Sequence, residues 1–319
     1  MTEESDSDQI RDPQVQVSAL EHPMVLAAMA RMASSGAWQR IIDERPLSEG
    51  VDIADAEFLV AAGAVTRAGE GTFRLALSEP MYRDPQAIAH SALYTLRWAL
   101  SHASGRSVGW ANEDSETILA FGRLTGHGGD MITNQLLPEL PAIESAFREG
   151  RAAFLDVGVG VAAISIRLVQ RHPGTRAVGL DVLPRVLKLA QAEVARSGLS
   201  ESIELRLQSV ADLHDQDCYD LAWVPQGFIS LEAFLDGIHN VFRALKPGGV
   251  MLVPVGLHPD LTEFVRARFI HSAFLIGGST ITPSELVERL NTAGFGDLVE
   301  WPLGPQVLMT ATKPRTAAR

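Results

Sequence analysis

Residues Leu155–Val169 read LDVGVGVAAISIRLV, and this stretch decides the fold. It begins in an apolar segment, places glycines at Gly158 and Gly160, and continues from Val161 with apolar residues at helical spacing. We interpret it as a strand, a tight turn and a helix. Glycines in such a turn allow the backbone to approach a ligand closely at the carboxyl end of a strand.

The second half of the chain alternates between strand and helix patterns. Predicted strands are Ala153–Val157, Ala177–Asp181, Ile203–Gln208, Leu221–Val224 and Val250–Val255, with helices such as Leu183–Ser197 and Leu231–Leu245 between them. Near the end, Thr282 caps a predicted helix over Pro283–Leu290, and two further strand patterns follow. The alternation predicts an α/β, Rossmann-like domain with a mainly parallel sheet flanked by helices.

Three occupants compete for the glycine turn: a dinucleotide, S-adenosylmethionine (SAM), or no ligand. GVGVAA fits the loose dinucleotide pattern. Asp156, just before the turn, would repel a pyrophosphate but would attract the ammonium group of SAM. Asp181 ends the next strand, where a carboxylate accepts hydrogen bonds from ribose in either ligand. The structural alternative is that both aspartates cap the helices that follow them.

Four motifs in order resemble those of the class I SAM-dependent methyltransferases. They are LDVGVGVAA, VGLD, YDLAWVPQGFIS and ALKPGGVMLV, and the resemblance covers about residues 145–319. The preceding part is similar to the N-terminal domain of small-molecule methyltransferases that dimerise through a winged-helix-like module. The resemblance implies SAM as cofactor, a small-molecule acceptor such as a specialised metabolite in natural product biosynthesis, and a homodimer.

Carried over position by position, the resemblance also implies the cofactor-binding residues. Asp156, Gly158 and Gly160 are expected to line the methionine part, and Asp181 the ribose. The adenine is expected to lie beside Val182, Leu183, Ser209 and Val210. Pro225 and Gln226 are expected to border the transferred methyl group. Two positions depart from the family pattern. Ala162 stands at the third glycine, and Ser209 stands where an aspartate is common.

The general base of the reaction is not evident in the sequence. Related O-methyltransferases place a histidine after the fourth strand, and the equivalent position near Gly227 has none. His271, which precedes the turn FLIGGST, is our candidate base. The acceptor atom is therefore left open as oxygen, nitrogen or activated carbon. A SAM-binding relative that does not methylate (a cyclase, hydroxylase or decarboxylase-like enzyme) and an NAD-dependent oxidoreductase are the alternatives.

The first half of the chain is predicted to be helical with one hairpin. Residues 1–20 form an expected disordered tail, 21–84 a winged-helix-like dimerisation domain, 85–148 a helical connecting layer, and 149–319 the SAM-binding domain. Apolar spacing is helical from His22 to about Pro46, and a hairpin is expected around Gly69–Gly71. A DNA-binding regulator is disfavoured because the candidate recognition helix, DIADAEFLVAAG, carries three acidic and no basic residues.

Composition excludes several classes of partner. The formal net charge of −12 disfavours nucleic acid, and no apolar run has the roughly 18 residues of a membrane span. The single cysteine, Cys218, cannot form an internal disulfide, and the acidic N-terminal residues are unlike a secretory signal. We expect a cytoplasmic protein. Because the histidines lack metal-ligand spacing, no metal is expected.

Overall fold

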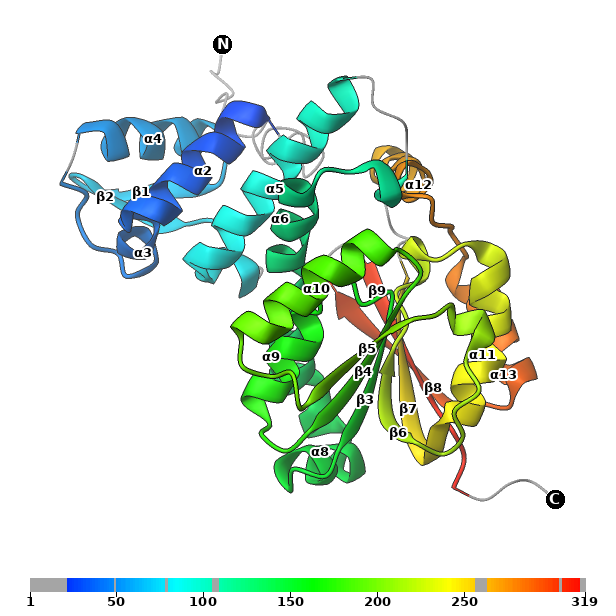
Figure 1. Ribbon diagram of the computed structural model, residues 1–319. Helices are drawn as coiled ribbons and strands as arrows, with labels where there is room; N and C mark the ends of the chain where they lie inside the picture. Colours follow the sequence, from blue (N-terminus) through cyan, green and yellow to red (C-terminus); the bar gives the residue numbers. More distant parts are fainter. Residues whose placement is uncertain are drawn as a thin grey trace, which may run out of the picture. The chain divides into compact units, whose positions relative to one another are not determined.

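The computed structural model describes residues 22–48, 50–77, 80–104, 109–255, 263–303 and 306–315. The predicted tail, residues 1–20, lies outside this part of the chain. The chain divides into two compact units, residues 1–105 and 106–319 (Figure 1). No helix in the described ranges is both long and apolar enough to cross a membrane.

The first unit is helical with one small hairpin. Its elements are α2 (Pro23–Ser35), α3 (Ala37–Ile42), α4 (Gly50–Ala61), β1 (Val65–Gly69), β2 (Thr72–Leu75), the short helix η2 (Pro80–Arg83) and α5 (Pro85–Ala103). The helical pattern from His22 is interrupted because Gly36 adopts φ +84°, so two helices form there instead of one. Trp38, Met32 and Leu59 are buried at the centre of this unit.

The helix–hairpin arrangement of a winged helix is present in this unit. The antiparallel hairpin β1–β2 turns at Glu70 and Gly71, as predicted. Helix α4 precedes it, and two of its acidic residues, Asp52 and Asp55, are buried. Asp55 forms an ion pair with Arg31 of α2. This carboxylate therefore links two helices of the unit, although it lies on the helix that would contact DNA in a DNA-binding winged helix.

The second unit is built on a seven-stranded sheet. The strands are β3 (Ala153–Val157), β4 (Arg176–Asp181), β5 (Ile203–Leu207), β6 (Tyr219–Trp223), β7 (Leu245–Val255), β8 (Gly296–Leu303) and β9 (Gln306–Thr312). Their order is β5-β4-β3-β6-β7-β9-β8. The pairs among β3–β7 are parallel, while β9 runs antiparallel to both β7 and β8. Every strand predicted in this region is present, although β7 begins five residues earlier than predicted.

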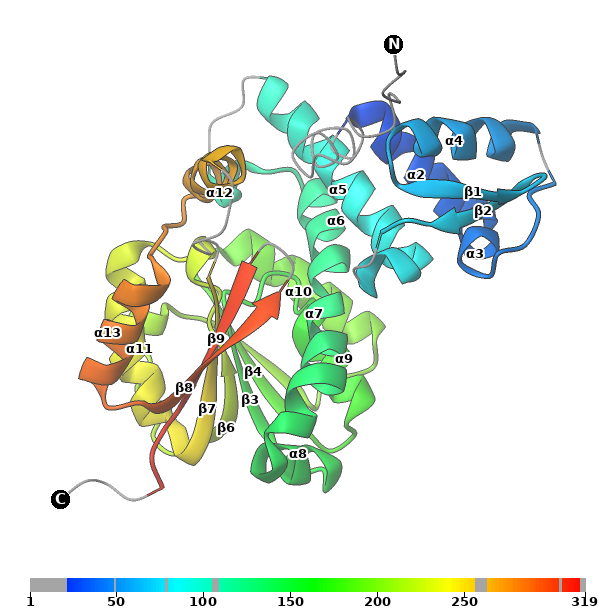
Figure 2. The same cartoon turned by 180° about the vertical axis from the view of Figure 1, so that it is seen from behind.

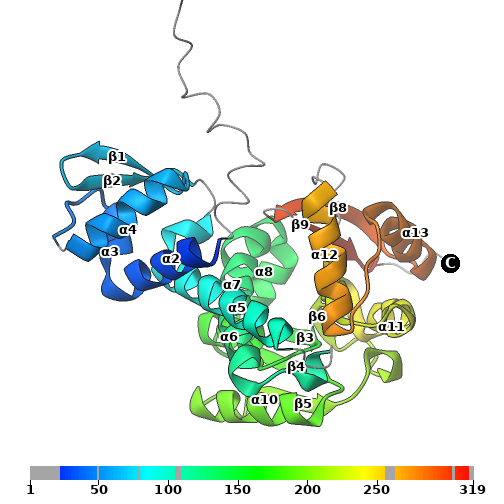
Figure 3. The same cartoon turned by 90° about the horizontal axis from the view of Figure 1, so that it is seen from above.

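Helices cover both faces of this sheet (Figure 2). They are α6 (Ser115–Thr125), α7 (His127–Met131), α8 (Pro141–Arg148), α9 (Ala163–Arg171), α10 (Pro184–Arg196), α11 (Leu231–Ala244), α12 (Glu263–Ile276) and α13 (Pro283–Ala293), with shorter turns η3 (Trp110–Asn112), η4 (Ile132–Leu136), η5 (Leu137–Glu139), η6 (Val210–Asp212) and η7 (Gln226–Phe228). Figure 3 shows β5 beside α10 near one edge of the unit and β8 toward the other. The predicted cap of α13 is present, since the Thr282 hydroxyl accepts from the Glu285 N–H at 3.2 Å.

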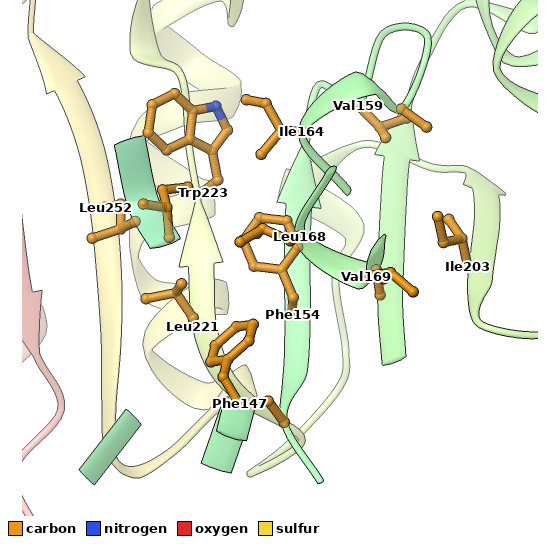
Figure 4. Close-up of a cluster of buried hydrophobic side chains, with 14 of the residues drawn as sticks. Phe147, Phe154, Val159, Ile164, Leu168, Val169, Ile203, Leu221, Trp223 and Leu252 are labelled. Atoms are coloured by element: carbon orange, nitrogen blue, oxygen red, sulfur yellow. The ribbon is translucent and has the colours of Figure 1, made fainter. Parts of the chain in front are cut away.

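Two hydrophobic cores lie on opposite faces of the sheet. Because side chains alternate along a strand, neighbouring residues of one strand enter different cores. In β6, Leu221 and Trp223 pack against α8 and α9 (Figure 4), while Ala222 packs on the opposite face. This double burial makes the central strands largely apolar, as is typical of a parallel sheet covered on both sides. It also fixes the strand ends from which the candidate site is built.

Candidate functional site

The glycine turn follows β3 and contacts the ends of two neighbouring strands. Gly158 and Gly160 have φ of +63° and +56°, a left-handed conformation that glycine adopts without steric cost. The Val159 N–H donates to the carbonyl of Leu180 at 2.8 Å, which holds the turn against the end of β4. On the other side, a Cβ at Gly158 would lie 3.8 Å from Pro225, after β6. The turn thus lies at the carboxyl ends of three adjacent strands.

Ala162, at the third glycine position, is also left-handed. Its φ is +62°, and it is fully buried at the N-cap of α9. The backbone shows that the position favours glycine, because a left-handed conformation costs an L-residue about 1–2 kcal/mol. The alanine side chain is therefore accommodated at the expense of backbone strain.

Asp156 is buried beneath the turn. Only 2% of its surface is exposed, and its carboxylate accepts a hydrogen bond of 2.6 Å from the Ser165 hydroxyl in the first turn of α9. Burial raises the pKa of Asp156 to about 7, although hydrogen bonds from the Ser165 side chain and backbone act in the opposite direction.

Asp181, at the end of β4, joins the glycine turn to the start of α10. Its carboxylate accepts from the N–H of Gly160 at 3.1 Å and from the N–H of Leu183 at 2.9 Å. Burial raises its pKa, and the backbone hydrogen bonds oppose that effect. Each oxygen has a second lone pair, so these two bonds orient the carboxylate without exhausting its capacity to accept others.

The residues expected beside adenine lie at the ends of β4 and β5. Val182 is 60% exposed and Leu183 is partly buried where α10 begins. Ser209 caps the short helix η6, accepting from the Ala211 N–H at 3.2 Å. The side chain of Val210 is buried, and a Cβ added at Gly237 of α11 would lie 2.7 Å from it. Only the backbone of Val210 can therefore face a ligand at this edge.

The segment after β6 is tied to the segment after α12. Pro225 and Gln226 are buried, and the Gln226 amide donates to the Ser279 hydroxyl at 2.8 Å. Ser279 in turn donates to the carbonyl of Ile229 at 2.7 Å. A Cβ at Gly278 would come within 1.9 Å of the Gly227 carbonyl oxygen. The two backbones are in close contact, and Gln226 has one fixed orientation.

His271 is not part of this cluster of contacts. It lies on α12 and is exposed, and no hydrogen bond from its side chain is found among the described residues. Its assignment as a general base stays a prediction. The described part of the chain also brings together no group of three histidine, cysteine, aspartate or glutamate side chains suited to a metal ion.

Two features of the site were missed by sequence analysis. Three aromatic rings, those of Trp110, Phe121 and Phe228, form a cluster beside the segment after β6. Arg185, in the first turn of α10, donates to carbonyl groups of the segment that carries Trp110. Phe228 lies within the motif YDLAWVPQGFIS, but Trp110, Phe121 and Arg185 match no motif, so only the folded arrangement shows that these residues meet.

Comparison with known proteins finds a match to a methyltransferase domain within the second unit. Residues 154–249 match the family model described as a methyltransferase domain. Among curated proteins, the chain is 27% identical over 175 residues to erythromycin 3''-O-methyltransferase of Saccharopolyspora erythraea, covering 52% of this chain and 57% of that protein. It is 25% identical over 112 residues to demethylmenaquinone methyltransferase of Thermus thermophilus, covering 35% and 50%. The chain thus spans about half the length of the curated relatives it matches.

Solved structures extend the likeness in fold to almost the whole chain. The apo form of the S-adenosylmethionine-dependent methyltransferase SibL superposes with a TM-score of 0.60 at 18% identity, covering 95% of this chain and 100% of that one. Human N-acetylserotonin methyltransferase in complex with SAM gives a TM-score of 0.55 at 16% identity, covering 98% and 100%. At such identities the likeness concerns the fold. The predicted fold and the predicted resemblance to the class I methyltransferases are confirmed.

Proposed function

Because residues 154–249 form a methyltransferase domain, we propose that this protein transfers a methyl group from SAM to a small molecule. One observation carries the proposal: the left-handed glycine turn and the oriented carboxylate of Asp181 meet at the edge of the sheet, with the Gly160 N–H bonded to that carboxylate. A turn in which two glycines expose the backbone, beside a fixed hydrogen-bond acceptor, suits a nucleoside with free ribose hydroxyls.

The charges at this edge favour SAM over a dinucleotide. Asp156 and Asp181 are both buried near the turn, and the negative charge of Asp181 raises the cost of ionising Asp156. A pyrophosphate placed there would add repulsion. A ligand with a sulfonium and an ammonium group would instead stabilise both carboxylates. We assign Asp181 to the ribose, and Asp156 to electrostatic attraction of the methionine part from beneath the turn.

When bound, SAM supplies a methyl group activated by the positive sulfur atom. The lone pair of the acceptor attacks the methyl carbon, and the electron pair of the breaking carbon–sulfur bond stays on sulfur. The protein accelerates such a displacement mainly by holding the acceptor in line. Gln226, fixed by Ser279, would border the transferred methyl group. A neutral acceptor also loses a proton, and His271 stays the proposed base for it.

Calorimetric titration tests the cofactor assignment. We expect the protein to bind SAM and S-adenosylhomocysteine (SAH) and not to bind NAD. Asp181→Ala should weaken SAH binding by about 10- to 100-fold, the loss of hydrogen bonds to a charged group. Asp236→Asn, an exposed aspartate on α11, is the matched control and should bind SAH normally. Binding of NAD alone would refute the proposal and favour the oxidoreductase.

Methyl transfer itself requires a second experiment. Candidate acceptors are incubated with SAM carrying a labelled methyl group, and the label and SAH are followed together. Equal amounts of SAH and methylated product support the transferase. If product forms without SAH, the protein belongs with the SAM-binding relatives that do not methylate. Specialised metabolites are the first acceptors to test, since one relative is named for the antibiotic erythromycin.

We further propose that the first unit mediates a homodimer. Large apolar side chains on α2, α4 and α5 are exposed, among them Met24 at 62% and Leu100 at 72%. Exposed apolar groups of this kind often mark a protein interface. Light scattering should give the mass of two chains, and Leu100→Glu should shift the equilibrium toward one chain. A monomer at all concentrations would contradict this proposal.

A cytoplasmic location is proposed on the single cysteine, which suits a reducing compartment. Cell fractionation should recover the protein with cytoplasmic enzymes. Recovery of the protein outside the cytoplasm would overturn this assignment.

A further inference from the structure

A short segment, Gly109–Ser115, connects several parts of the second unit; we call it the strap. At one end the Gly109 N–H donates to the carbonyl of Leu275 in α12 at 2.7 Å. At the other, Arg185 of α10 bonds three groups of the strap: the carbonyl of Glu113, the carbonyl of Ala111 at 3.3 Å, and the hydroxyl of Ser115 at 3.4 Å. A planar guanidinium suits this task, because its donors diverge in a fixed geometry.

Arg185 lies close in sequence to the expected nucleoside site. It is the second residue of α10 and follows Leu183 by two positions. The N–H of Leu183 bonds to Asp181, which also accepts from the glycine turn. A ligand that bonds to Asp181 therefore acts on the residues that begin α10. Any small movement there is passed to the guanidinium of Arg185 and to the strap that it holds.

The strap carries Trp110, whose ring belongs to the aromatic cluster described above. Its centroid lies 5.2 Å from Phe121 and 6.2 Å from Phe228, with planes near perpendicular, and Phe121 and Phe228 lie 5.1 Å apart. Phe228 comes two residues after Gln226, which would border the transferred methyl group. The strap thus reaches from the nucleoside side of the site to the acceptor side.

Helix α6, which continues the strap, is packed directly on the glycine turn. Ile118 of α6, Val161 of the turn and Val186 of α10 form one buried cluster, and Trp110 packs against it. Gly122 approaches Val161 so closely that a Cβ would lie 2.0 Å from the valine methyl group. The turn, the start of α10 and the helix that continues the strap are therefore in direct contact, with little free volume between them.

We infer that Arg185 is a positioning residue that couples the two halves of the proposed site. Through its hydrogen bonds to the strap, it transmits occupancy of the nucleoside side to Trp110 and the aromatic cluster on the acceptor side. The inference rests on the proposed SAM site, and it assigns to Arg185 no direct contact with either ligand. It predicts that cofactor and acceptor bind cooperatively, with Arg185 carrying the coupling.

Tryptophan fluorescence with SAH as the probe tests this inference. The chain has five tryptophans, so the difference between the wild type and Trp110→Phe isolates the signal of Trp110. When Arg185 is intact, addition of SAH should change the fluorescence signal of Trp110. In Arg185→Ala, calorimetry should give an SAH affinity within about threefold of wild type, while the Trp110 response falls by at least half. Arg185→Lys keeps the positive charge but loses the diverging donors of the guanidinium, so its Trp110 response should lie between those of the wild type and Arg185→Ala.

The outcomes separate the inference from the function it rests on. Absence of SAH binding to the wild type, by calorimetry, refutes the proposed function. Two results overturn the coupling when SAH binds normally. In the first, the wild type shows no Trp110 response; in the second, Arg185→Ala and Arg185→Lys show the same response as the wild type. Arg196→Ala is the control: Arg196 is exposed on the same helix, pairs with the partly buried Glu193, and its loss should leave both readouts unchanged. If Arg185→Ala does not fold, Arg185→Lys is judged by the same criterion.

Discussion

Replacing Asp156 with asparagine should stabilise the protein while weakening its cofactor site. The asparagine amide has nearly the shape of the carboxyl group, and its oxygen can still accept from Ser165. What disappears is the negative charge, which is costly in a side chain that is only 2% exposed. Asp156→Asn thus separates the stability of the fold from the electrostatics of the site.

The magnitude follows from the pKa of Asp156, which burial raises from 3.8 to about 7. Between these values the folded protein keeps a proton that the unfolded chain has lost, so its stability decreases as the pH rises. At about 1.36 kcal/mol per pKa unit, the full cost above pH 7 is about 4 kcal/mol. From pH 5 to pH 8 the accumulated change is about 2–3 kcal/mol. The asparagine variant lacks this dependence.

Urea unfolding of the ligand-free protein at pH 5 and pH 8 measures the effect. The difference in unfolding free energy, Asp156→Asn minus wild type, should grow by about 2–3 kcal/mol between the two values. Other titrating groups are common to both proteins and cancel in the difference. Asp236→Asn removes an exposed carboxylate on α11 and should show a difference that hardly varies with pH.

A difference for Asp156→Asn that stays constant, or that favours the wild type more strongly at pH 8, would refute the reasoning. It would mean that the hydrogen bonds from Ser165 outweigh burial, so that Asp156 is ionised well below neutrality in the folded state. SAM affinity gives an independent check. It should be weaker in the variant, and in the wild type it should weaken as the pH falls below about 7, because protonation removes the attracting charge.

Three further substitutions test the packing around the site. Gly122→Ala should destabilise the protein by about 1–3 kcal/mol and weaken SAH binding, because its Cβ would meet Val161 at 2.0 Å; urea unfolding and calorimetry measure both. Ala162→Gly should raise the thermal midpoint slightly, since relief of the left-handed strain exceeds the entropy that glycine adds to the unfolded chain, and a lower midpoint would contradict this. Thr282→Ala should cost about 1 kcal/mol through loss of the α13 cap while leaving SAH affinity unchanged.

The sequence predicts the parts of the fold that follow from local patterns. Strands β3, β4, β6 and β7 were recognisable because burial makes each a largely apolar run between turn residues, whereas the edge strand β5 alternates apolar and polar residues. The cap at Thr282 was recognisable because a threonine, a proline and a glutamate at fixed spacing suffice for it. The antiparallel direction of β9 does not follow from local patterns, since periodicity carries no information on strand direction.

The site was predictable only where motifs carry it. Asp156, Gly158, Gly160 and Asp181 could be named because the glycine turn fixes their spacing. The motif does not specify what each side chain contacts, so neither the burial of Asp156 nor its bond to Ser165, nine residues further along the chain, was predicted. The same holds for the strap and Arg185. Their contacts join positions more than 70 residues apart in the chain.

The position of β9 has a consequence for synthesis of the chain. β9 lies between β7 and β8, although it is made after both. While the ribosome has not yet released residues 306–312, β7 presents an open edge, and β8 has no neighbouring strand of the described sheet to join. Open edges invite pairing between molecules. Nascent chains that stall before this strand are therefore the species most exposed to aggregation, and we expect chaperones to bind them there.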